Sequence, residues 1–82
     1  MRQILTHSAQ LGQILAGRRR AFKLSQRALA GKLPISQNRL SEIEANPGSL
    51  TVERLLELVN LLGLELVIRD RPSADRSTKT EW

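Results

Sequence analysis

The chain has 82 residues, of which 40% are hydrophobic and 2% aromatic, and it carries a net charge of +5. This length allows one domain with a modest core, and the absence of cysteine excludes a disulfide framework and a thiolate metal site. So few aromatic side chains nearly exclude a stacking platform for single-stranded nucleic acid. The sequence has neither a long apolar run nor a signal-peptide pattern, so we expect a cytoplasmic protein that does not contact a membrane.

The positive charge is concentrated in the first half of the chain. Residues 1–48 carry eight Lys and Arg against two Glu, a net charge of +6, whereas residues 49–82 carry five basic and six acidic residues, a net charge of −1. A basic half on a small domain is typical of a protein that binds a polyanion. Basic residues that only solvate helix faces would give the same composition, so charge alone does not decide between the two.

Apolar spacing and capping residues predict four helices, at residues 8–22, 26–32, 37–45 and 52–62. A hydroxyl side chain stands at the expected N-cap of each helix: Ser8, Ser25, Ser36 and Thr51. Pro34 ends the second helix because proline lacks a backbone donor, and Gly63 suits the position just past the fourth helix. The chain is therefore expected to be an all-α bundle.

Beyond the fourth helix the pattern changes. Residues 64–68 (LELVI) are apolar and partly alternate, which predicts a short strand, and residues 69–82 form a polar, charged tail that contains Trp82. We divide the chain into an arm at residues 1–7, a domain at residues 8–68 and a flexible tail at residues 69–82.

The third helix has a polar side that is unusual for so short an element. Its large apolar residues are Leu40 and Ile43, and its outward residues are Ser36, Gln37, Asn38, Arg39, Ser41 and Glu42. Gln and Asn match adenine bidentately and Arg matches guanine, so this side suits contacts to base edges in the major groove. We expect DNA contacts from Ser36, Gln37, Asn38, Arg39 and Ser41.

The preceding helix supplies contacts that do not depend on base sequence. Gln26 begins this helix, where backbone N–H groups favour a phosphate, and Arg27 and Lys32 add positive charge. A short polar helix between two turns can also be a solvated connector. The apolar spacing argues against that interpretation, because it forms one small core around the helix pair: Leu24, Leu29, Ala30, Leu33, Ile35, Leu40 and Ile43.

The string LSQRALAGKLPISQNRLSEIEANP resembles the Cro/C1-type (XRE) helix-turn-helix family of phage repressors and bacterial regulators, and the likeness covers about residues 8–62. The resemblance implies a lambda-repressor-like bundle that binds double-stranded DNA. It also implies that Gln26 contacts phosphate and braces the recognition helix, and that Arg19 forms an ion pair with Glu44. Two positions depart from the family, which commonly has glycine where Lys23 and Pro34 stand. Because proline disfavours a positive φ, we expect the turn at Pro34 to be rebuilt.

The run LTVERLLELVNLLGLELVIRD, followed by a polar tail with Glu81 and Trp82, is similar to the HipB antitoxins of HipBA toxin–antitoxin modules. This resemblance implies that the strand pairs with the same strand of a second protomer. It also implies that Trp82 docks on a HipA-like serine/threonine kinase toxin. The alternatives are that Trp82 is incidental or folds back on its own domain.

A physical argument also supports a homodimer. An apolar strand after four helices has no neighbour within its own domain, and two-fold pairing would satisfy its backbone groups. A dimer also presents two recognition helices to a palindromic operator. The expected dimerisation residues are Leu64, Leu66, Val67 and Ile68.

These patterns favour a transcriptional repressor that acts as the antitoxin of a type II toxin–antitoxin module. Two alternatives stay open: a stand-alone phage-type or restriction-controller regulator, and a protein-interaction adaptor that does not recognise DNA sequence. We expect no enzymatic activity, cofactor or metal, because the chain has a single histidine and no clustered carboxylates or Gly-rich phosphate loop.

Overall fold

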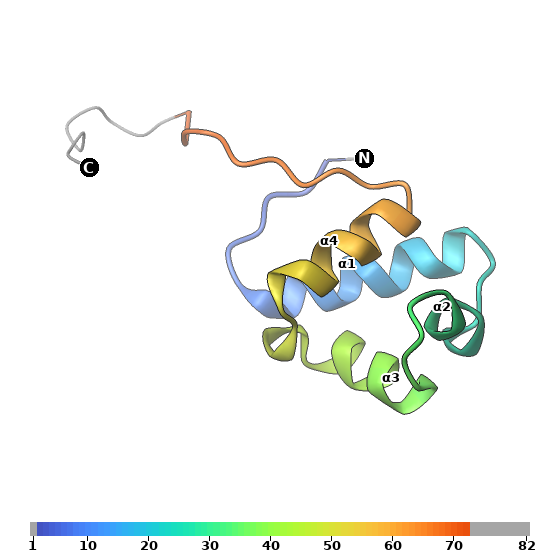
Figure 1. Ribbon diagram of the computed structural model, residues 1–82. Coiled ribbons are helices and arrows are strands. Elements are labelled where there is room, and N and C mark those ends of the chain that lie inside the picture. Colours follow the sequence, from blue (N-terminus) through green and yellow to red (C-terminus); the bar gives the residue numbers. More distant parts are fainter. Residues whose placement is uncertain (1, 73–82) are drawn as a thin grey trace.

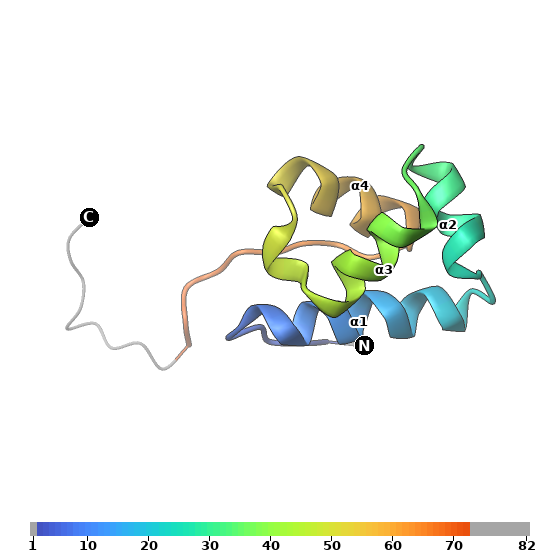
Figure 2. The same cartoon turned by 90° about the horizontal axis from the view of Figure 1, so that it is seen from below.

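The computed structural model describes residues 2–72 of the chain, which form four α-helices and one 3-10 turn (Figure 1). Their bounds are α1 (Ser8–Ala21), α2 (Gln26–Lys32), α3 (Gln37–Ala45), η1 (Pro47–Ser49) and α4 (Val52–Leu61). Figures 1 and 2 show α1, α3 and α4 around a common core, with α2 closing one end. The expectation of an all-helical helix-turn-helix bundle is confirmed.

Local capping explains where three of the helices begin. Ser25, Ser36 and Thr51 each accept a hydrogen bond from the backbone N–H three residues further on, at 3.0, 3.0 and 3.1 Å. The first helix differs from the prediction, because Ser8 is already helical and His7 is its N-cap. Here the Gln10 amide oxygen accepts from the backbone N–H groups of Thr6 (2.7 Å) and His7 (3.1 Å), so a side chain within the helix satisfies them.

The core is aliphatic and draws on every helix of the described chain. Its most buried large side chains are at most 2% exposed: Leu15, Leu29, Leu40, Ile43, Leu58 and Leu62. Burying such a side chain contributes roughly 1.5–3 kcal/mol, so a few residues on each short helix are enough to hold it in place. Helices this short would be only marginally stable alone, so packing into the shared core stabilises them.

The crossing of α1 over α3 is very close at Gly12. A Cβ atom built there would collide with the backbone carbonyl oxygen of Glu44 and lie 3.2 Å from Cδ of Pro47. Gly17, which lies further along α1, has no atom within 4 Å of its corresponding position. Glycine at position 12 thus allows α1 and the end of α3 to meet.

Two residues that replace expected glycines keep a left-handed backbone. Lys23 follows α1 with a φ of 59°, and Pro34 has a φ of 28° in the turn between α2 and α3. The expectation that this turn is rebuilt around Pro34 is wrong. The backbone N–H groups of Leu33 and Ile35 both donate to the Ala30 carbonyl, at 3.0 and 3.1 Å, and these bonds keep the turn while the proline is strained.

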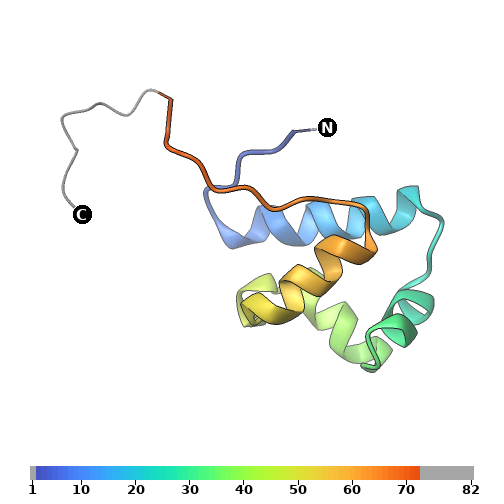
Figure 3. The same ribbon diagram turned by 45° about the horizontal axis from the view of Figure 1, so that its top comes forward.

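The predicted strand at residues 64–68 is not formed in the described part of the chain. Leu64 packs against the core and its N–H donates to the Val59 carbonyl at 2.9 Å, after Gly63 ends α4 with a φ of 67°. The segment then runs along the side of α1 and α4 opposite to α3 (Figures 1 and 3). A strand needs a neighbour for its backbone groups, and no other described segment of this single chain pairs with it.

None of the helices in residues 2–72 is long and apolar enough to cross a membrane.

The contrast between the two glycines of α1 gives a stability prediction. Gly12→Ala should lower the free energy of unfolding by about 1–3 kcal/mol, because the new methyl group forces α1 away from the Glu44 carbonyl. Gly17→Ala should raise it by about 0.5–1 kcal/mol, because alanine favours the helix and meets nothing. Urea unfolding followed by circular dichroism, at one fixed protein concentration, measures both values. Stabilisation of similar size by both substitutions would contradict the close crossing.

Candidate nucleic-acid interface

The outward side of α3 presents a row of short polar side chains. Leu40 and Ile43 are each 1% exposed and anchor the helix, while Gln37, Asn38 and Ser41 are exposed on its other side. Residues four apart on a helix are neighbours, so Gln37 lies beside Ser41. These three side chains belong to the polar side expected from the sequence, and the term polar face is used for them below.

Two other residues expected at this face are already engaged. The Ser36 hydroxyl caps α3 by accepting from the Arg39 backbone N–H. The Arg39 guanidinium donates to Glu42 Oε1 at 2.8 Å, to Ser49 Oγ at 3.2 Å and to the Ser49 carbonyl at 3.1 Å. The Arg39 guanidinium is therefore hydrogen-bonded within the chain, although its side chain remains 36% exposed, and its contact with a base stays a prediction.

A buried ion pair joins α1 to the end of α3. Arg19 donates from Nε to Glu44 Oε2 at 2.7 Å and from Nη2 to Oε1 at 3.2 Å, and its Nη1 binds the Leu24 carbonyl at 2.9 Å. The two side chains are 10% and 9% exposed. Gln26 Nε2 adds a bond to Glu44 Oε1 at 3.0 Å. Arg19 and Glu44 are thus brought together, and Gln26 braces α3 from the first residue of α2.

The environment of Glu44 alters its pKa. Burial by itself raises the pKa of this carboxyl group, but hydrogen bonds from Arg19 and Gln26 and the charges of Arg19 and Arg20 outweigh it. The pKa of Glu44 is therefore held below its ordinary value of 4.5. The ionised form is the one that the fold stabilises.

The three consecutive arginines of α1 occupy three different environments. Arg19 forms the buried ion pair, whereas Arg18 Nε donates to the Leu62 carbonyl at 2.8 Å and caps α4. Arg18 also lies over the Phe22 ring, 4.9 Å from its centroid. Arg20 is exposed and lines an open hollow together with Gln26 and Ser41. The 100° turn per helical residue points the three side chains in different directions, but it does not by itself say which of them lies beside α3.

The second helix, α2, also carries exposed positive charge. Arg27 and Lys32 are both exposed, as a phosphate contact requires. Sequence reasoning missed Arg54 of α4, whose Nη1 donates to the Leu33 carbonyl at 3.1 Å and to Glu57 Oε1 at 2.7 Å. The bond to the Leu33 carbonyl ties α4 to the turn before α3. It depends on a distant contact that carries no local sequence signal.

The expected dimerisation residues differ in their exposure. Leu64 is partly buried against the core, whereas Leu66, Val67 and Ile68 are 41%, 65% and 93% exposed. Trp82, the expected toxin-binding residue, lies outside the described residues.

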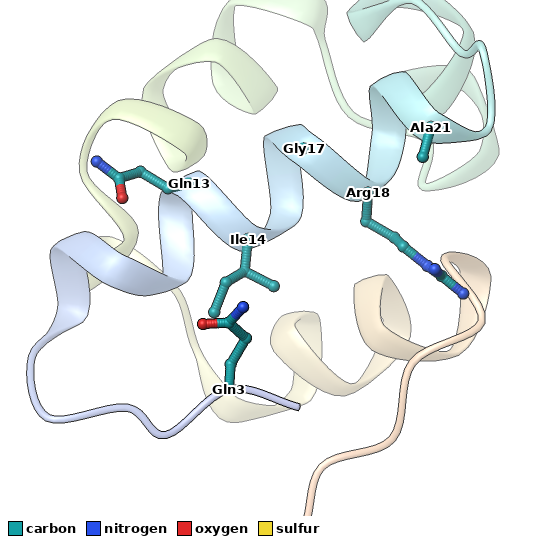
Figure 4. Close-up of a pocket in the computed structure, with 6 residues that line it drawn as sticks. All are labelled: Gln3, Gln13, Ile14, Gly17, Arg18 and Ala21. Atoms are coloured by element: carbon teal, nitrogen blue, oxygen red, sulfur yellow. The ribbon is translucent and has the colours of Figure 1, made fainter. Parts of the chain in front are cut away.

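An open hollow of about 390 Å³ lies between the N-terminal arm and α1 (Figure 4). Its lining consists of Gln3, Gln13, Ile14, Gly17, Arg18 and Ala21. In Figure 4, Gln3 lies beside Ile14 and Arg18 extends toward the end of α4, so the charged group of the lining is already used. No group of three metal-ligating side chains occurs within residues 2–72. The polar face of α3 is therefore the stronger candidate for a functional site.

A comparison with protein-family models places residues 14–68 in the helix-turn-helix family. The chain belongs to this family, of the XRE type. It is a DNA-binding transcription regulator, from a family that is generally non-enzymatic. Neither the curated proteins nor the solved structures gave a match.

The buried ion pair of this helix-turn-helix protein predicts a pH dependence. Because the pKa of Glu44 is lowered in the folded state, its contribution to stability is present above the ordinary glutamate pKa and is lost as the pH falls through the lowered value. Glu44→Gln should remove about 3 kcal/mol at neutral pH, since it leaves Arg19 buried without a counter-charge, and should flatten the acid limb. Urea unfolding at several pH values measures both effects.

Glu42→Gln is the matched control, because the Arg39–Glu42 pair is exposed, with side chains 36% and 63% accessible. It should change the unfolding free energy by less than about 1 kcal/mol. An unaltered acid limb in Glu44→Gln would show that another carboxylate governs acid unfolding.

Proposed function

We propose that this chain is a sequence-specific transcriptional repressor that binds a palindromic operator as a homodimer through α3. The observation that carries the proposal is the polar face of Gln37, Asn38 and Ser41 on a helix fixed from behind. The buried Leu40 and Ile43 and the bidentate ion pair of Glu44 hold that helix in one orientation. Base recognition needs such rigid placement, because hydrogen bonds to base edges discriminate only when the donors are held in position.

The basic residues around α3 supply the contacts that do not depend on base sequence. Arg27 and Lys32 on α2 and Arg20 at the end of α1 are all exposed. Arg20 lines the same hollow as Ser41, which puts a positive charge at the border of the polar face. These arginine and lysine side chains would neutralise phosphates on either side of the groove that α3 enters.

Two substitutions separate base contacts from phosphate contacts. Asn38→Ala should weaken binding to the selected operator by about 1–3 kcal/mol and leave binding to random DNA nearly unchanged, because a base contact is lost. Lys32→Ala should weaken both about equally and reduce the slope of affinity against salt by about one. Fluorescence anisotropy titrations at several salt concentrations measure these values. Equal losses on both DNAs for Asn38→Ala would remove Asn38 from the base-contacting set.

The C-terminal segment supports the dimer proposal. Leu66, Val67 and Ile68 expose apolar surface in the single chain, next to backbone groups without a strand partner in the described residues. Val52 and Leu56 of α4 are also exposed, at 68% and 42%. Pairing of residues 64–68 with the same segment of a second copy would satisfy the backbone and cover this surface.

Val67→Pro tests the pairing, because proline removes a backbone donor from the proposed ladder. We expect monomers or unfolded chain, whereas Val67→Thr keeps the donor and should remain a dimer. Sedimentation equilibrium combined with circular dichroism distinguishes these states. A fully folded monomer of the parent protein at nanomolar concentration would contradict the proposal.

The antitoxin role is a finer part of the same proposal. It is supported by the resemblance of the run from residues 50 to 70 and of Trp82 to the HipB antitoxins, which engage a HipA-like serine/threonine kinase toxin. Trp is the side chain most enriched at binding hot spots, and a polar segment with one large apolar group suits capture by a pocket. Tethering to a DNA-bound dimer would raise the local concentration of the toxin.

Trp82→Ala should weaken binding of a HipA-like kinase by about 1–3 kcal/mol, the usual range for one hot-spot side chain, and leave operator affinity unchanged. Asn38→Ala is the reciprocal control, since it should reduce operator affinity without affecting the kinase. Calorimetric titration of each variant against a HipA-like kinase and against operator DNA measures both. Loss of DNA binding in Trp82→Ala with kinase binding intact would place Trp82 at the DNA interface.

The same measurements separate the alternatives. A stand-alone regulator would select an operator but bind no kinase, and an adaptor would show no preference between operator and random DNA.

A further inference from the structure

A chain of hydrogen bonds fixes one carboxylate on the outward side of α3. The Ser49 carbonyl and hydroxyl oxygens accept from the Arg39 guanidinium at 3.1 and 3.2 Å, and Arg39 Nη1 donates to Glu42 Oε1 at 2.8 Å. Ser49 is itself anchored, because its hydroxyl donates to the Asn46 carbonyl at 2.9 Å. Arg39 is thus held by the η1 turn on one side and holds Glu42 on the other.

Glu42 stands where a ligand of the polar face would meet it. Its side chain is 63% exposed, and it lies one helical turn after Asn38, on the same side of α3. An uncompensated carboxylate here would repel DNA phosphates. The guanidinium of Arg39 supplies the compensating charge and orients the carboxylate, so Glu42 is prepared to accept a hydrogen bond.

We infer that Glu42 is a specificity-determining residue that accepts a hydrogen bond from a cytosine amino group, with Arg39 as its positioning residue. This inference rests on the proposed binding of operator DNA through α3. It replaces the expectation that Arg39 itself contacts guanine.

The chemistry of the major groove selects cytosine as the partner. An ionised carboxylate only accepts hydrogen bonds, so it is repelled by the acceptor atoms that guanine and thymine present there. Adenine offers an amino donor but places the N7 acceptor beside it, whereas cytosine presents its amino donor without that neighbour. Glutamine, which both donates and accepts, matches adenine instead.

The test is selection of binding sites from a random DNA library, with the full chain and the variants Glu42→Gln, Arg39→Ala and Glu42→Gln/Arg39→Ala. The parent should enrich a motif with one C·G-preferring position in each half-site, at which any other pair costs about tenfold in affinity. Glu42→Gln should change the preference at that position to A·T. Arg39→Ala should weaken the cytosine preference at the same position and no other.

The double variant separates positioning from direct contact. If Arg39 acts through Glu42, removing it in the Glu42→Gln background should leave the A·T preference in place. Glu57→Gln is the matched control, since Glu57 forms the same kind of pair three residues after Arg54, at 2.7 Å, on α4. It removes an equal charge and should leave the selected motif unchanged.

The outcomes are distinct. A parent motif that Glu42→Gln leaves unaltered would overturn this inference while the proposed function stands. If Arg39→Ala loses the C·G preference and Glu42→Gln keeps it, Arg39 rather than Glu42 makes the base contact. If the parent enriches no motif, both the inference and sequence-specific binding fail.

Discussion

The contact between Arg19 and Glu44 is the interaction on which the other parts of this small protein depend. Both side chains are nearly buried, and the guanidinium satisfies both carboxylate oxygens and the Leu24 carbonyl. Two charges in an apolar setting are costly unless all their hydrogen-bonding atoms are matched, so the pair tolerates little change in geometry. The bare backbone of Gly12 lets the helices approach closely enough for this contact. Through it, α1 sets the orientation of α3.

Once α3 is fixed, the arginines around it divide into structural and available groups. Arg18 and Arg54 bind backbone carbonyls at the end of α4 and in the turn before α3, and Arg39 is held by Ser49. Arg20 remains exposed at the edge of the polar face. A count of basic residues therefore overstates the charge that can neutralise phosphates. The hydrogen bonds of these arginines also help to hold together a domain that is too small for a large core.

The side of the molecule opposite to α3 exposes apolar side chains and backbone groups that have no partner among the described residues. Its C-terminal segment keeps Val67 and Ile68 exposed and leaves their backbone without a strand partner among the described residues. In Figure 3, α3 itself lies on the opposite side of the bundle from this segment. A second copy bound there would leave both recognition helices accessible, so dimerisation and DNA binding need not compete for surface.

The sequence by itself determined the helices and the helix-turn-helix, because Ser25, Ser36 and Thr51 act within one turn of their own position and apolar spacing is also local. It did not determine the direction of the arginines or the backbone at Pro34. The hydrogen bonds of Arg39 depend on a turn ten residues away, and the left-handed φ of Pro34 is imposed by the bonds and packing of its neighbours. Only the tertiary structure decided these features, because their energies come from contacts between distant segments that local preference cannot encode.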